Sequence, residues 1–271
     1  MLGKLFKHDM IATWKVAVSI DLALIVLGIL TGFVLHALPH VEESFGMGLM
    51  FVSFIGLFYI GVIAANIVTI IYMVMRYYRN LYTAEGYLTF TLPVKTDMII
   101  HSKVLTGALW MFLSYLCTFI SLGFAGLGFL SSIDVPKEEI LDAVREVFSF
   151  LGVIDPGFMA LFAMIALVTP FAAVLCMYFC VSIGQLWQGH KVLGTVLCVI
   201  GLYIFNQFAS QIVFFASGFW HLMAQSASDI DASFPSIYKH MLLNITILTV
   251  IQSIVYYVVC IFISRKKVNL D

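Results

Sequence analysis

Six long apolar stretches fill most of this sequence, and they constrain its fold more than any other feature. Each exceeds the roughly 20 apolar residues that an α-helix needs to cross a hydrocarbon core of about 30 Å. They run over residues 16–38, 47–75, 104–130, 158–186, 192–218 and 241–263. Only 11% of the 271 residues are charged, whereas globular proteins are about a quarter charged. The sequence therefore predicts an all-α polytopic membrane protein, with six transmembrane helices in a single domain spanning residues 1–271.

The few charges lie unevenly around these six stretches. With six spans, only Lys137, Arg145 and Lys239 are basic on one side of the membrane. The other side carries Lys4, Lys7, Lys15, Arg76, Arg79, Lys95, Lys103, Lys191, Arg265, Lys266 and Lys267. Basic loops stay in the cytoplasm, so this second side is predicted to be cytoplasmic, together with both ends of the chain.

Two shorter segments have helical patterns outside the spans. Residues 2–15 place Leu2, Leu5, Phe6 and Met10 on one face, which predicts an amphipathic helix in the cytoplasmic interface. In the loop after span three, Asp134 and Pro136 precede apolar residues at helical spacing. This pattern predicts an outer amphipathic helix at about 136–151.

No catalytic, metal or nucleotide motif is present. The chain lacks HExxH and GxSxG, and its cysteines do not have zinc-ligand spacing. Residues 184–191, GQLWQGHK, come nearest to a phosphate-binding loop, but His190 occupies the lysine position and no Ser or Thr follows Lys191. We therefore predict that the chain is not an enzyme and holds no cofactor or metal of its own.

Buried charge is equally scarce. Asp21 is the one carboxylate clearly inside a span, near the cytoplasmic end of span one, and we expect it to reach the interface or to pair with a basic residue. Ion-driven carriers use polar relays in the membrane. An ion-coupled carrier is therefore disfavoured, and energy for uphill transport is expected to come from another chain.

The connection between spans two and three, residues 76–103, is the longest cytoplasmic one. It interleaves Tyr77, Tyr78, Tyr82 and Tyr87 with Arg76, Arg79, Asn80 and Glu85. Aromatic and arginine side chains are enriched at protein interfaces, although an interfacial aromatic belt has a similar composition. We expect residues 75–83 to continue span two as a helix, Gly86 to allow a turn, and Leu92-Pro93 to end any helix.

The stretch RNLYTAEGYLTFTLPV, with Lys103, Trp110 and the GQLWQGHKVLG turn, resembles the membrane subunits of exporter-type bacterial ABC transporters, especially Gram-positive ones. This resemblance covers essentially the whole chain and is most specific at residues 85–93. It implies a bacterial plasma-membrane permease whose loop between spans two and three docks onto a separate ATP-binding subunit. It also implies a second permease subunit, identical or related, and places ATP and Mg²⁺ on the partner.

By position, the resemblance assigns docking to residues 79–87, hereafter the docking segment. Its predicted contact residues are Arg79, Asn80, Leu81, Tyr82, Thr83, Glu85, Gly86 and Tyr87. The main alternative is a membrane-embedded sensor or scaffold that uses the same loop to bind a regulator. Besides these protein partners we expect contact with membrane lipid, and none with nucleic acid.

A polar strip in span five is the candidate substrate path. Its residues are Asn206, Gln207, Ser210 and Gln211, with Asn66 of span two as a further member. Such amides either hydrogen-bond a neighbouring helix or line a path. Spans with few charges suit an amphipathic, peptide or drug-like substrate.

Overall fold

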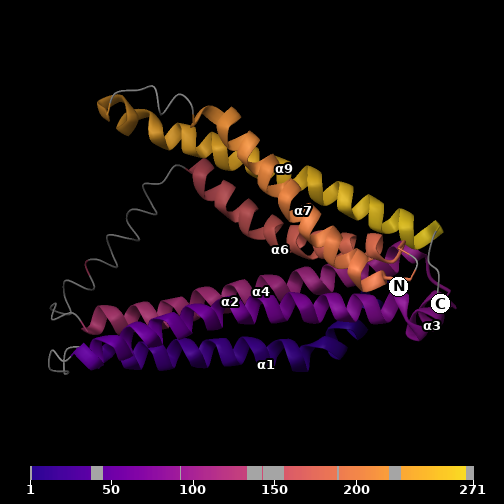
Figure 1. Ribbon diagram of the computed structural model, residues 1–271, viewed down its shortest axis with the longest axis horizontal. Coiled ribbons are helices and arrows are strands. Elements are labelled where there is room, and N and C mark those ends of the chain that lie inside the picture. The colour runs from indigo at the N-terminus through magenta and orange to yellow at the C-terminus, as the bar shows by residue number, and fades with distance from the viewer. Residues whose placement is uncertain are drawn as a thin grey trace. The chain divides into compact units, whose positions relative to one another are not determined.

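The computed structural model describes residues 2–37, 45–91, 93–132, 142, 156–187, 189–219 and 227–266, and its elements are all helical (Figure 1). They are α1 (Leu2–His36), α2 (Phe45–Tyr82), α3 (Ala84–Thr91), α4 (Thr96–Ser132), α6 (Pro156–Gly184), α7 (Lys191–Phe214), the π-helical segment η2 (Phe215–Phe219) and α9 (Ala227–Lys266). The outer helix expected at 136–151 lies outside the described residues, apart from residue 142.

Six of these helices are long and apolar enough to cross a membrane. Their candidate spans contain 27 to 37 residues, about 40 to 55 Å at 1.5 Å per residue, which exceeds the thickness of the hydrocarbon core. The predicted all-α class and the six spans are confirmed, and the chain is a multi-pass membrane protein. Its orientation in the membrane stays a prediction.

The amino-terminal segment is helical, as expected, but it does not form a separate helix. Residues 2–15 and the first span together make one 35-residue helix, α1. Charged and polar residues such as Lys4 and Lys7 are compatible with a helix, so the loss of apolar character before residue 16 does not end it. The interfacial position of residues 2–15 stays a prediction.

The chain divides into two compact units. The amino-terminal unit comprises Lys7–Tyr72 and Leu109–Asp155, and therefore most of α1, most of α2 and the second part of α4. The carboxyl-terminal unit comprises Met1–Phe6, Met73–Ala108 and Pro156–Asp271. It holds the end of α2, all of α3, the start of α4, and α6, α7 and α9.

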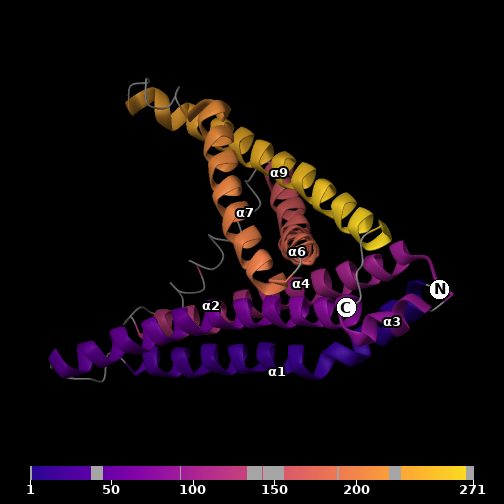
Figure 2. The same ribbon diagram turned by 45° about the vertical axis from the view of Figure 1, so that its right-hand side comes forward.

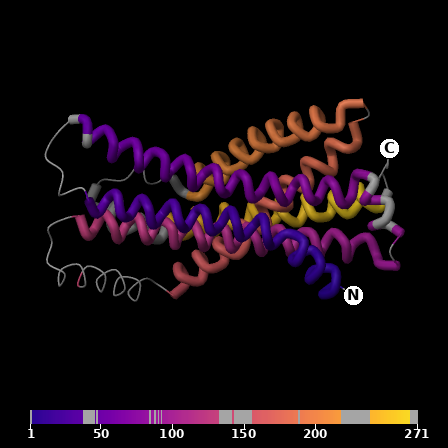
Figure 3. Tube along the Cα trace, turned by 90° about the horizontal axis from the view of Figure 1, so that it is seen from below, coloured from indigo at the N-terminus to yellow at the C-terminus, as the bar shows by residue number. Residues whose placement is uncertain are grey.

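In the amino-terminal unit, α1, α2 and α4 run side by side (Figure 3). Small residues bring α1 and α4 into close contact: a Cβ atom added at Gly28 would overlap Ser121, and one added at Gly128 would overlap the backbone of Gly32. Gly28 and Gly32 form a GxxxG pair, a motif that permits close helix approach. Here that pair faces another helix of the same chain.

In the carboxyl-terminal unit, α6 packs against α9 and α7 (Figure 2). The turn between α6 and α7 is tight, since a Cβ atom at Gly184 would overlap the backbone of Thr195. Gly189 in this turn has φ +91°, a conformation that favours glycine. This turn sets α7 against the end of α6.

Candidate functional site

The docking segment is almost entirely helical. Helix α2 continues to Tyr82 and α3 begins at Ala84, so the chain bends at Thr83 and not at Gly86. The Thr83 hydroxyl donates to the Arg79 carbonyl (2.5 Å), and Gly86 N–H donates to the Thr83 carbonyl (2.7 Å). The expected turn at Gly86 is therefore wrong, because Gly86 lies inside α3. Helix α3 ends at Thr91, just before Leu92-Pro93, as predicted.

Polar side chains link α2, α3 and α4 across this bend. Arg79 Nη2 lies 3.2 Å from Glu85 Oε1, with side chains 70% and 53% exposed. The Asn80 amide, with its nitrogen toward Glu85, donates to Glu85 Oε2 (3.0 Å) and accepts from Lys103 Nζ (2.6 Å). These polar contacts connect α3 with α2 while Arg79 and Glu85 stay accessible.

The aromatic part of the segment lies largely in the core. Tyr77, Leu81 and Tyr82 are 1%, 0% and 3% exposed, and Gly86 is buried as well. Among the predicted docking residues, Arg79 and Glu85 are exposed and Asn80 and Thr83 are half-buried, while the Tyr87 side chain lies outside the described part. Within the docking segment, Leu81 and Tyr82 therefore pack in the core, whereas Arg79 and Glu85 form its accessible charged surface.

Ser182 of α6 joins this segment to two other helices. Tyr82 Oη donates to Ser182 Oγ (3.0 Å), Tyr77 Oη lies 3.1 Å from the same oxygen, and Ser182 Oγ donates to Cys260 Sγ of α9 (3.8 Å). A serine hydroxyl has one hydrogen and two lone pairs. If both tyrosines donate, all three are used, and Ser182 connects α2 to α6 and α9.

Tyr178, one turn before Ser182 on α6, reinforces this connection. Its ring stacks on Tyr77 with centroids 3.9 Å apart and planes 9° from parallel. Its hydroxyl donates to the Lys103 carbonyl of α4 (3.4 Å). The close fit also involves Gly107, where an added Cβ atom would lie 2.9 Å from the Tyr178 hydroxyl.

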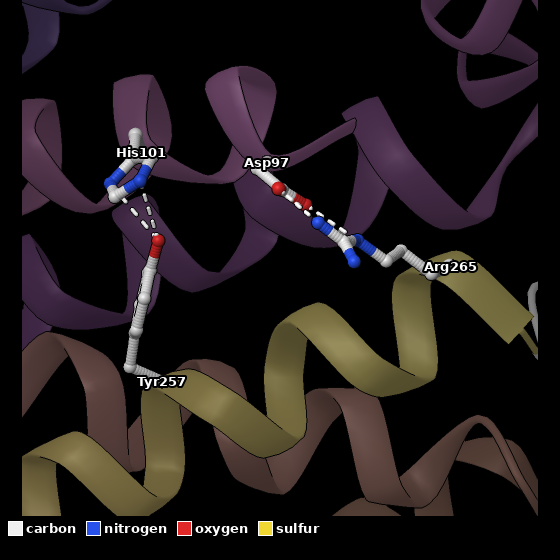
Figure 4. A network of polar contacts seen from close by, with 4 residues as sticks. All are labelled: Asp97, His101, Tyr257 and Arg265. Carbon is white, nitrogen blue, oxygen red and sulfur yellow. Dashed lines mark hydrogen bonds and ion pairs between the residues drawn. The ribbon is translucent and has the colours of Figure 1, made fainter. Parts of the chain in front are cut away.

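A second set of contacts joins the start of α4 to the end of α9 (Figure 4). The Arg265 guanidinium donates to both carboxylate oxygens of Asp97, including a 2.8 Å bond from Nε to Oδ1. Further along the two helices, the Tyr257 hydroxyl lies 2.7 Å from His101 Nε2. These contacts are exposed, so water and salt reach them.

The predicted substrate-path residues do not share one environment. Asn206 Oδ1 accepts from the Tyr256 hydroxyl of α9 (3.1 Å), which is the helix-pairing role that intramembrane amides often have. Ser210 is half-buried, and Gln207 and Gln211 are exposed on α7.

Asn66 belongs to the amino-terminal unit, whereas the α7 residues belong to the carboxyl-terminal one. Asn66 Nδ2 donates to the Val62 carbonyl (2.9 Å) and to Thr118 Oγ1 of α4 (3.1 Å). Its Oδ1 is buried without a hydrogen-bond partner in the described part of the chain. Asn66 thus pairs α2 with α4 and keeps an unused acceptor.

Sequence reasoning did not single out Ser182, Tyr178, Asp97 or Arg265 as contact residues. Ser182 and Tyr178 lie within an apolar run, and Ser182 contacts residues 78 to 105 positions away. No local pattern signals such partners. Within the described residues, no group of three or more His, Cys, Asp or Glu side chains is arranged to hold a metal ion.

Comparisons with known proteins found no match, either to a protein-family model or to a curated protein or a solved structure.

Proposed function

We propose that this chain is the membrane subunit of an ABC-type exporter in a bacterial plasma membrane, driven by ATP hydrolysis on a separate subunit. One observation carries the proposal: the end of α2 and the short helix α3 present an exposed Arg79–Glu85 pair, and Tyr77 of the same end of α2 is bonded to Ser182 of α6, which bonds to α9. Such an arrangement suits a segment that receives a push from a partner and transmits it to spans.

The docking surface is small and charged. Arg79 and Glu85 are the accessible charges of residues 79–87; Asn80 donates to Glu85 and accepts in turn from Lys103. Arginine is among the residues that contribute most to protein interfaces. We infer that the ATP-binding subunit contacts this pair. The buried side chains of Leu81 and Tyr82 keep the docking segment rigid, so a displacement of the segment moves the helices packed against it.

In this proposal, movement of the docking segment passes first to α6 and α9. Tyr77 and Tyr82 share Ser182, and Ser182 bonds to Cys260, so displacing α2 must either move these helices or break the shared bonds. Switching between arrangements of packed helices is a common way to alternate access. The scarcity of charge on the spans favours an amphipathic, peptide or drug-like substrate.

The test reverses the docking charges without breaking their pair. In the double variant Arg79→Glu with Glu85→Arg, the two side chains still attract each other, so the ion pair is kept while the charge pattern offered to a partner is inverted. We expect the tagged wild-type chain to co-purify with a P-loop ATPase, and the double variant to retain about a tenth of it or less, the scale of a hot-spot loss.

Lys191→Glu is the control, because it reverses one positive charge, as Arg79→Glu does, at the first residue of α7; it should leave co-purification unchanged. If no P-loop chain accompanies the wild-type protein, the exporter proposal is wrong. A regulator without a P-loop at the same surface would instead establish the sensor or scaffold alternative.

A further inference from the structure

Among the described residues, Asp21 of the first span has no basic partner, so the ion pair that was one of the two expectations from the sequence is not seen there. Asp21 is 7% exposed, and the nearest lysine before it on α1, Lys15, is six residues away, about 9 Å along the helix axis. Ionisable groups within spans are costly and usually functional. The charge of Asp21 must therefore be either balanced by a partner or removed by protonation.

Asp21 begins a chain of oxygen contacts across three helices of the amino-terminal unit. Asp21 Oδ1 on α1 lies 2.5 Å from Ser114 Oγ on α4. Ser114 Oγ lies 3.2 Å from Thr69 Oγ1 on α2, and Thr69 Oγ1 lies 3.0 Å from the Ala65 carbonyl oxygen. The first and third separations lie within the usual range of O–H···O hydrogen bonds, and the 3.2 Å contact between Ser114 and Thr69 is longer.

The number of hydrogens available to these oxygen contacts depends on whether Asp21 is protonated. Three oxygen contacts need three hydrogens, but the Ser114 and Thr69 hydroxyls supply one each. A protonated Asp21 supplies the third: the carboxyl donates to Ser114, Ser114 donates to Thr69, and Thr69 donates to Ala65. An ionised Asp21 would accept from Ser114 and leave the longer Ser114–Thr69 contact without a hydrogen of its own.

The surroundings provide no compensating charge. No charged side chain acts on Asp21 among the described residues. The titratable group that faces it from α4 is the Cys117 thiol, which is uncharged when protonated, and α2 contributes the Thr69 hydroxyl. A carboxylate without a partner is strongly disfavoured in hydrocarbon.

We propose that Asp21 is a proton-binding site, occupied while α1, α2 and α4 are packed together and emptied when water reaches it. On release, the carboxyl O–H bond breaks, the proton passes to water, and the negative charge stays on Asp21, where water solvates it. Since the packed arrangement holds one more proton than the hydrated one, lowering the pH favours packing. This inference does not depend on the proposed exporter function.

Infrared spectroscopy of the full chain in lipid vesicles at neutral pH tests the proposal without any ATPase. A protonated carboxyl gives its own carbonyl stretching band, distinct from that of carboxylates. We expect this band in the wild type, with a shift in D₂O and a further shift when aspartate is labelled with ¹³C. The Asp21→Asn variant should lose it, and Asp97→Asn, which alters an aspartate paired with Arg265, should keep it.

The Ser114→Ala variant and the isotope shift in the wild type complete the test. Ser114→Ala removes the acceptor but keeps the carboxyl, so the band should persist at a changed frequency. The isotope shift in the wild type needs no variant, so misfolding of Asp21→Asn would not prevent the measurement. Absence of the band at neutral pH, or its persistence in a folded Asp21→Asn, would overturn the proposal.

Discussion

Ser182 is the residue on which the contacts below the docking segment converge. It accepts from Tyr82, lies within bonding distance of Tyr77, and donates to Cys260, all in the buried core. Ser182→Ala would leave two buried tyrosine hydroxyls without this acceptor, at a typical cost of about 1–3 kcal/mol per unsatisfied group. We expect a clear drop in the thermal unfolding midpoint of the purified chain.

The control for this prediction is Ser53→Ala. The Ser53 hydroxyl is exposed and bonds to the Leu49 carbonyl of its own helix, so its loss should change stability by about 0.5 kcal/mol or less. Equal effects of the two substitutions would mean that the shared bonds at Ser182 contribute nothing beyond an ordinary hydroxyl.

Residue-scale features were the least predictable from the sequence. The residue types in 76–103 pointed to the tyrosines, but nothing in the sequence indicated that Tyr77 and Tyr82 are buried. Asp21 is conspicuous as a carboxylate in an apolar run, whereas its partner Ser114, 93 residues away, is not. Hydroxyls on apolar helices carry no local signal of what they face, because the partner depends on packing between distant segments.

At the scale of helices, the contacts between α4 and α9 form a separable link. The Asp97–Arg265 pair is solvent-exposed, and exposed ion pairs contribute little and are screened by salt. We expect Asp97→Arg and Arg265→Asp each to lower the thermal unfolding midpoint slightly at low salt, and the double variant to recover it. The effect should be smaller than that of Ser182→Ala.

A double-mutant cycle measured at low and at high salt checks this link. Its coupling term should be favourable at low salt and should vanish at high salt. A coupling that persists at high salt would mean that the pair is shielded from solvent and that α4 and α9 are held more firmly than an exposed pair allows.

Helix boundaries show where hydropathy stops being informative. The apolar stretches located all six long helices, but α2 extends to Tyr82 and α4 begins at Thr96, beyond the predicted spans 47–75 and 104–130. Arg76, Arg79 and Lys103 end the apolar character without ending the helix, because arginine and lysine have high helix propensity. Loss of hydrophobicity marks where a span ends, whereas turn chemistry, here at Thr83, marks where the helix ends.

At the scale of the whole molecule, α7 suggests a second subunit. Gln207 and Gln211 are exposed four residues apart, and neither side chain has a hydrogen-bond partner within the described residues. Exposed amides are unfavourable against lipid and favour association with another helix. If the proposed second permease subunit packs against α7, the double variant Gln207→Leu with Gln211→Leu should lower the fraction of chain that cross-links to it.

Phe208→Leu is the control on the same helix, because its side chain is 67% exposed and its replacement removes no hydrogen-bonding group. It should leave the cross-linked fraction unchanged. If the double glutamine variant also leaves it unchanged while substrate-stimulated ATP hydrolysis falls, the two amides would belong to the substrate path instead.

The contact between Gly32 and Gly128 has a thermodynamic consequence of its own. Neither residue has a side-chain rotamer to immobilise, so α1 and α4 meet there without side-chain entropy loss. In lipid, where the hydrophobic effect does not draw helices together, the attraction comes from dispersion between touching backbones. Its strength therefore depends on closeness alone, and this part of the helix pair can separate and re-form without side chains having to be reordered.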